Sequence, residues 1–177
     1  MEPREHNNVL LDLRAVFGVQ ARVTVSSAAS AGEYVEMDCT AEPGSRTIVH
    51  YHPEQEETFR VVEGTLELLC DGRWIAIGAG EDRTVPKRAK HAWRNPGALP
   101  VRFVNVHRPA LGFQAHMETL DHLARAGKIR GTSDVRSVIY MSMSARQHRP
   151  DVAVTPPQWV VNLMAFIGRR LGFSLNQ

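Results

Sequence analysis

The chain has 177 residues, the length of one domain with room for a short appendage. Hydrophobic residues make up 43% and charged residues 23%, which is typical of a globular protein and excludes a disordered or collagen-like chain. The formal net charge of +2 is too small to indicate nucleic-acid binding, so no nucleic-acid partner is predicted.

The sequence carries no recognisable membrane or export signal. Its start is polar, and its most apolar stretch, residues 160–167, is far shorter than the roughly 20 residues of a bilayer-spanning helix. Cys39 and Cys70 lack the CxxC spacing of a cysteine metal site. Two reduced thiols fit a cytoplasmic location, which we therefore expect, with a single disulfide as the alternative.

Residues 1–21 form an N-terminal segment, in which the apolar residues between 10 and 17 fit either a short helix or an edge strand. From residue 22 to 108, short runs rich in Val, Ile, Thr and Phe alternate with Gly and Pro, which is typical of strands. Glu63-Gly64 and Asp71-Gly72 each predict a tight hairpin. Many short strands without intervening helices favour a sandwich or barrel. The predicted strands are 22–26, 33–40, 47–52, 57–62, 65–70, 74–77, 82–85, 91–95 and 101–107.

After Pro109 the apolar residues recur at helical spacing, so residues 109–177 are expected to form a C-terminal helical extension. Helices are predicted at 111–126, with Gly127 as the stop, at 135–146 and at 157–171, and a loop is predicted at 147–156. The last helix is apolar on more than one side, which indicates that it packs between the β domain and another surface, such as a second subunit.

Two histidines and a carboxylate occupy one face of neighbouring strands. His50 and His52 are two residues apart, so their side chains leave the same side of a strand. Glu57 alternates with Phe59 and Val61, which indicates an inward-facing position. A buried carboxylate is costly unless a cation compensates it, so this arrangement suggests a metal site.

His91 alternates with Trp93 and is a candidate for the same inner face. Three imidazoles and one carboxylate suit a divalent transition metal such as Fe, Mn, Ni or Zn, and they leave coordination positions for water or substrate. Glu56 is the rival of Glu57 for the carboxylate position. The alternative interpretation of the whole set is a barrel interior in which these side chains only pack.

The two segments resemble the paired motifs of the cupin superfamily, G-x5-H-x-H-x3or4-E-x6-G and G-x5-P-x-G-x2-H-x3-N. One position departs from the second motif, because Arg88 stands where the pattern has Gly. If that position is left-handed, Arg costs about 1–2 kcal/mol there. The matching positions are Gly44, His50, His52, Glu57 and Gly64 in the first motif and Gly80, Pro86, His91 and Asn95 in the second.

The resemblance implies an all-β fold, a double-stranded jelly-roll barrel at residues 22–108, with His50, His52, Glu57 and His91 as metal ligands. It also implies a homodimer. We expect a metal-dependent enzyme that acts on a small, apolar or aromatic molecule inside the barrel. The metal would supply redox or Lewis-acid chemistry, and Glu57 would also act as the catalytic base.

Two uses of such a site fit the sequence. The first is an enzyme, either an oxidoreductase resembling quercetinase-type dioxygenases or an isomerase or cyclase. The second is a non-catalytic cupin that binds a metal or small ligand as a sensor, carrier or assembly module.

Other residues have weaker assignments. Trp93, Phe59, Phe103, Met37 and Cys39 fit either a pocket lining or plain core. His107 fits a core or rim position better than the pocket. The remaining histidines lie outside the motifs and are expected at the solvated surface, namely His6, His116, His122 and His148.

Overall fold

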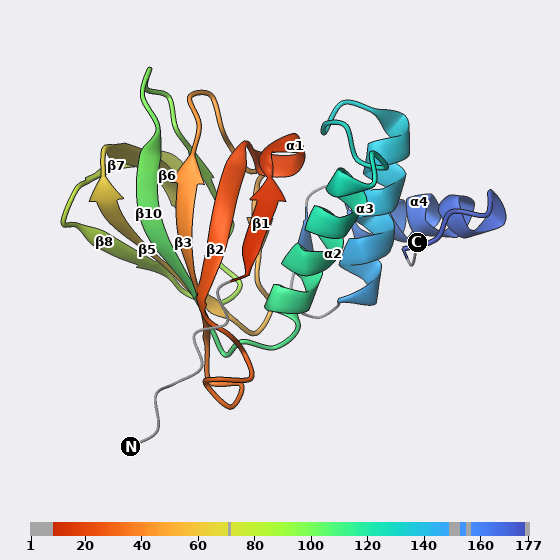
Figure 1. Ribbon diagram of the computed structural model, residues 1–177, viewed down its shortest axis with the longest axis horizontal. Coiled ribbons are helices and arrows are strands. Elements are labelled where there is room, and N and C mark those ends of the chain that lie inside the picture. The colour runs from red at the N-terminus through yellow and green to blue at the C-terminus, as the bar shows by residue number, and fades with distance from the viewer. Residues whose placement is uncertain (1–8, 71, 149–152, 155–156, 176–177) are drawn as a thin grey trace.

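The computed structural model describes residues 9–70, 72–148, 153–154 and 157–175. Two antiparallel sheets form the β part, and a group of helices lies beside one edge of the larger sheet (Figure 1). The larger sheet has the order β1 (Leu10–Leu13), β2 (Val19–Val25), β3 (Val35–Ala41), β10 (Val101–Arg108), β5 (Glu56–Glu63) and β8 (Asp82–Val85). The smaller sheet has the order β11 (Ala153–Val154), β4 (His50–Tyr51), β9 (His91–Arg94), β6 (Thr65–Cys70) and β7 (Arg73–Gly78).

Strict alternation of buried side chains creates the interior between the sheets. In β10, every second residue from Val101 to His107 is buried, and β3 shows the same pattern from Val35 to Ala41. Phe59 and Phe103 are almost fully buried and lie with ring centroids 5.9 Å apart. The expected all-β jelly roll with a C-terminal helical extension is thereby confirmed.

The ambiguous N-terminal stretch contains both of the elements that the sequence allowed. β1 is an edge strand that pairs with β2, and a single helical turn, α1 (Arg14–Phe17), follows it. Gly18 ends that turn with a φ of 75°. The larger sheet therefore begins before residue 22, and the division into domains at 22 and 108 stays an expectation.

The predicted hairpin at Glu63-Gly64 is wrong. β5 belongs to the larger sheet and β6 to the smaller one, so the chain crosses between the sheets at this point. Gly64 has a φ of 84°, and a Cβ atom there would lie 3.0 Å from Cγ2 of Val101, so both the backbone and the space favour glycine. The second hairpin is confirmed, because β6 and β7 pair from Thr65 to Gly78, although Asp71 lies outside the described residues.

The described part of the extension contains three helices of 13 residues each: α2 (Phe113–Arg125), α3 (Val135–Gln147) and α4 (Gln158–Arg170). They match the predicted helices closely at both ends. α2 runs beside β1, where Asp121 accepts a hydrogen bond from the backbone of Asp12 at 2.6 Å (Figure 1). The predicted loop at 147–156 contains the short strand β11, which pairs with β4.

None of these helices is both long and apolar enough to cross a bilayer, as judged over the described residues. Cys39 is buried and Cys70 is partly buried, and no disulfide joins the two.

Candidate metal centre

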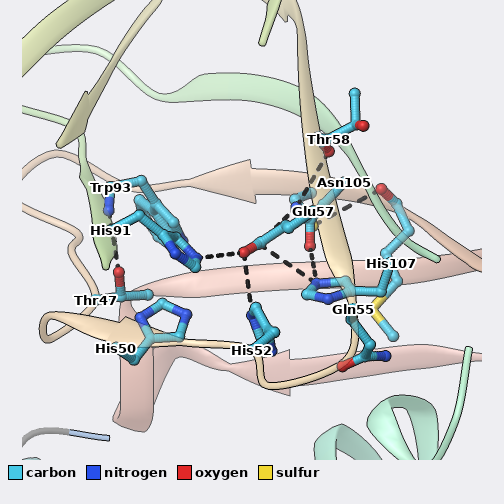
Figure 2. A network of polar contacts seen from close by, with 12 residues as sticks. Thr47, His50, His52, Gln55, Glu57, Thr58, His91, Trp93, Asn105 and His107 are labelled. Atoms are coloured by element: carbon cyan, nitrogen blue, oxygen red, sulfur yellow. Dashed lines mark hydrogen bonds and ion pairs between the residues drawn. The ribbon is translucent and has the colours of Figure 1, made fainter. Parts of the chain in front are cut away.

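The four sequence-predicted ligands meet inside the β part (Figure 2). His50 on β4 and His91 on β9 are direct partners across the smaller sheet. His52 follows β4, and Glu57 lies near the start of β5 in the larger sheet. One donor atom from each residue lies within 4.8 Å of the others, so the structure brings together side chains that are up to 41 positions apart in the sequence.

Backbone hydrogen bonds fix the orientation of two of the imidazoles. Nδ1 of His50 donates to the carbonyl oxygen of Ile48, and Nδ1 of His91 donates to that of Ala89, each at 2.9 Å. A carbonyl oxygen can only accept, so the neutral rings keep their lone pair on Nε2. This is the arrangement expected of metal-binding histidines.

Glu57 is held from one side and faces the imidazoles from the other. Nδ2 of Asn105 donates to Oε1 at 2.9 Å, and Nε2 of His107 lies 3.4 Å from the same oxygen. Oε2 lies 2.6 Å from Nε2 of His91 and 3.2 Å from Nε2 of His52. Glu57 is 4% exposed, whereas its rival Glu56 is exposed and has no place in the cluster.

The electrostatics of the cluster favour an ionised carboxylate among imidazoles. Burial by itself raises the pKa of Glu57, but His107, His52 and His91 outweigh it and hold that pKa well below its ordinary value. Burial lowers the pKa of His50 to about 3, and the neighbouring imidazoles of His91 and His52 act in the same direction. Burial also opposes protonation of His91, yet the hydrogen bond that the protonated ring donates to Glu57 raises its pKa overall.

The turn before His91 tolerates the unusual arginine. Arg88 has a φ of 68°, so the position is left-handed, as the glycine of the motif implies. Its backbone N–H donates to the carbonyl oxygen of His52 at 2.7 Å, which ties this turn to the ligand segment. The departure from the motif therefore leaves His91 in place.

A large cavity of about 730 Å³ adjoins the cluster. His50, His52 and Glu57 line it on the β side together with Trp93 and Phe103. Its other walls come from outside the predicted barrel, because α1, α2, α3 and α4 all contribute lining residues. A largely apolar cavity with a few polar groups in its wall is the usual form of a small-molecule site.

The remaining candidates divide between the cavity and the core. Met37 and Cys39 line the cavity, whereas Phe59 is core. His107 also lines it, is 1% exposed, and stacks on Phe113 with ring centroids 3.4 Å apart.

The prediction of a solvated His116 is wrong, because that ring is 5% exposed and lines the cavity. His122 is exposed, as expected, and His148 is partly buried. His6 lies outside the described residues. Helical spacing could have indicated this burial, since His116 shares one face of α2 with Phe113, Met117 and Leu120.

Asn105 is a second residue that sequence reasoning missed. Its place in phase with Phe103 and His107 marks an inward position, but only the structure shows that its amide holds Glu57. Asn95 of the second motif serves the backbone instead. Its Nδ2 donates to the carbonyl oxygens of Ala41 and Leu99 at 3.0 and 2.9 Å, which fixes the loop after β9.

The donor set fits a divalent transition metal. Imidazole nitrogens with one carboxylate suit Fe, Mn, Ni or Zn, and the adjoining cavity leaves room for further ligands. A bound cation would explain why a buried carboxylate lies so close to the imidazoles of His91 and His52.

Comparisons with known proteins agree with this geometry. The family model described as "Cupin domain" matches residues 37–107. Protein SchB of Streptomyces halstedii is 31% identical over 116 residues, which cover 63% of this chain and 83% of SchB. The polyketide synthase CurC of Streptomyces cyaneus is 37% identical over 82 residues, which cover 44% of this chain and 51% of CurC.

A solved structure shares the fold. The polyketide cyclase RemF of Streptomyces resistomycificus superposes with a TM-score of 0.51 at 23% identity, over 61% of this chain and 79% of RemF. The chain spans about half the length of CurC and most of the length of SchB. The helices after residue 109 contribute little to the family match, which ends at His107.

Proposed function

Since this chain belongs to the cupin superfamily, we propose that it is a metal-dependent enzyme that cyclises or isomerises a small, ketone-bearing molecule of the polyketide type. One observation carries the proposal, namely that four ligand-type side chains converge and that three of them, His50, His52 and Glu57, line a largely apolar cavity of about 730 Å³. That volume suits a molecule of several fused or linear rings.

His50, His52, Glu57 and His91 would hold the metal, with Fe, Mn, Ni and Zn as the candidates. When bound, the metal would supply Lewis-acid chemistry, which polarises a carbonyl group and lowers the barrier to enolisation. His50, His52 and Glu57 line the cavity, so a substrate oxygen would reach the metal from the cavity side.

Glu57 is the proposed catalytic base. Its carboxylate is held ionised by the imidazoles around it, and Asn105 and His107 fix Oε1. Oε2 faces the imidazoles and would also be the oxygen that holds the metal, so it would release the metal to accept a proton from the carbon next to a substrate carbonyl. The apolar walls, including Trp93 and Phe103, exclude water from that transfer.

The substrate class rests on the cavity and on the relatives together. CurC bears the name of a polyketide synthase and is 37% identical over the matched segment. Polyketide skeletons are apolar carbon chains or rings that carry ketone oxygens. Such molecules suit a cavity with a metal-binding end and apolar walls.

Two other uses of the site are distinguishable from this one. A quercetinase-type dioxygenase would use the same ligands but consume oxygen. A non-catalytic sensor or carrier would bind metal and ligand without chemical conversion. A cavity partly walled by helices is compatible with storage as well as with catalysis, so turnover decides between them.

The metal assignment has a direct test. Replacement of His50, His52 or His91 by Ala removes one of four donors, and we expect elemental analysis to show that most of the metal is lost. His122→Ala, in an exposed position on α2, is the matched control and keeps its metal. Unchanged metal content in all three ligand variants would refute the site.

The reaction class is tested with metal-loaded chain and phenolic polyketide ketones under air and under nitrogen. We expect mass-neutral or water-losing products at equal rates in both atmospheres, and slow or absent turnover in Glu57→Gln. Oxygen uptake with a flavonol would instead favour the dioxygenase. Tight ligand binding with no conversion of any substrate would favour the sensor or carrier.

A further inference from the structure

His116 is a buried polar ring on the face of α2 that covers the cavity. Phe113, Met117 and Leu120 share that face and also line the cavity. His116 itself is 5% exposed and is among the lining residues. The metal cluster does not include it, so a polar group in these apolar surroundings needs a separate role.

Ser144 on α3 fixes the ring. Nδ1 of His116 and Oγ of Ser144 lie 2.9 Å apart, and Ser144 is fully buried. Within the described part of the chain, that hydroxyl has no second hydrogen-bond partner. If Nδ1 carried the hydrogen, the hydroxyl proton would be buried without an acceptor, which is costly. The hydroxyl therefore donates to Nδ1, and the neutral ring carries its hydrogen on Nε2.

The ring is neutral near pH 7. Burial lowers the pKa of His116 to about 3, and the histidines at positions 148 and 52 act in the same direction. Protonation on both nitrogens is thus excluded under ordinary conditions. The ring offers one N–H donor at Nε2.

That donor has no partner in the part of the chain that the structure describes. Among the described residues, Nε2 of His116 forms no hydrogen bond. Nε2 also keeps some exposed surface, because it is not one of the fully buried side-chain atoms without a partner. Those atoms are Oγ of Ser27, Oε1 of Gln55 and Nδ1 of His107 among the described residues. Nε2 is therefore the open atom of a ring that lines the cavity.

We propose that His116 is a specificity-determining residue that donates a hydrogen bond from Nε2 to a carbonyl oxygen of the substrate. The substrate would be held at two points, by oxygens at the metal end and by a second carbonyl group under α2. The apolar walls between these points fit its carbon skeleton. This inference rests on the proposed function, since it assumes a metal-binding oxygen at the other end.

The hydrogen position is tested first, without any ligand. Long-range proton–nitrogen NMR spectra of the zinc-loaded full chain report which nitrogen of each histidine carries the hydrogen. We expect His116 to be protonated on Nε2, and Ser144→Ala to lose that preference. Protonation on Nδ1 in the wild-type chain would overturn the proposal.

Binding is tested with a matched pair of probes, a dihydroxyanthraquinone and the corresponding dihydroxyanthrone. Both carry the phenol and carbonyl oxygens that chelate a metal, but only the quinone has a second carbonyl group. We expect the wild-type chain to bind the quinone about tenfold more tightly, the effect of one hydrogen bond. His116→Leu should abolish the preference, and His116→Gln, which keeps an N–H donor, should retain most of it.

His122→Leu, the same substitution at an exposed position of the same helix, is the control and keeps the preference. Equal wild-type affinities, no binding of either probe, or a preference that survives in His116→Leu would overturn the proposal. Zinc removal separates it from the proposed function. If each probe binds as tightly without zinc as with it, and the quinone is still preferred, the metal-dependent function fails and the role of His116 stands.

Discussion

At the scale of single residues, the cluster depends on side chains that do not themselves face a metal. Asn105 holds Oε1 of Glu57 at 2.9 Å, and carbonyl oxygens of Ile48 and Ala89 hold the rings of His50 and His91. Such outer contacts set the direction of each donor atom. The motif spacing locates the four donors but contains none of these supports.

His116 predicts a pH effect on stability. Its pKa in the folded chain is about 3, against an ordinary value of 6.5, and the histidines at positions 148 and 52 face it. As the pH falls below 6.5, the unfolded chain therefore binds a proton at this group before the folded chain does. The resulting loss of stability is about 1.4 kcal/mol per pH unit, whereas above 6.5 the contribution is intact.

His116→Asn removes this titration while its amide still reaches the Nδ1 position. We expect the free energy of unfolding, measured by urea denaturation, to fall less steeply with decreasing pH in the variant than in the wild type. His122→Asn, at an exposed position, should follow the wild-type slope. Identical slopes for His116→Asn and wild type would contradict the assignment of a neutral, buried ring.

At the scale of elements, the turn between β8 and β9 holds a strained residue. Arg88 adopts a φ of 68°, and its side chain pairs with Glu54 at 3.1 Å in an exposed position, which contributes little. Arg88→Gly should therefore raise the free energy of unfolding by about 1 kcal/mol. Arg88→Ala keeps the strain and should not stabilise the chain.

Chemical denaturation of these two variants, with Lys87→Gly as the control, checks the turn. Lys87 has no positive φ, so glycine there should destabilise the chain through its greater freedom when unfolded. A glycine at position 88 that stabilised no more than alanine would show that the backbone strain is negligible.

Local patterns were enough to predict most strands and all three long helices. The strands at 65–70 and 82–85 match β6 and β8, because alternation and turn residues are properties of neighbouring positions. The crossing at Gly64 could not be predicted, since the same Glu-Gly pair suits a hairpin or a passage between sheets. β11 was missed because it pairs with β4, about 100 residues earlier, and its own sequence is too short to show a period.

The site was predicted in part for the same reason. His50, His52, Glu57 and His91 follow from motif spacing, which encodes how strands are arranged in a known fold. Motif spacing does not predict that α2, α3 and α4 line the cavity. Which face of each helix meets the β part depends on packing between residues that are far apart in the sequence. The burial of His116 could not be predicted for this reason, because it depends on how α2 packs.

At the scale of the whole molecule, the four donors come from both sheets. His50 and His91 lie in the smaller sheet and Glu57 in the larger one, so a bound metal would join them. Removal of the metal with a chelator should lower the unfolding temperature, with a free-energy change of about 2.7 kcal/mol when metal is present at 100 times its Kd. Calorimetry with and without zinc measures it.

His91→Ala provides the control for that experiment, since it should unfold at the same temperature with and without zinc. A wild-type chain that unfolded at the same temperature with and without zinc would contradict the metal site. The homodimer stays a prediction. The exposed apolar residues of α4, Trp159, Leu163 and Phe166, are consistent with the further contact surface that the sequence suggested for this helix.

The helices that line the cavity have a consequence for the evolution of such a protein. α2, α3 and α4, which all lie beyond residue 109, contribute part of the cavity wall, whereas the four donors lie between residues 50 and 91. Mutations that reshape this part of the wall can alter which molecules are accepted without disturbing the reactive centre. Related proteins can therefore come to accept different substrates through changes in the C-terminal helices, while selection keeps the residues of the metal centre unchanged.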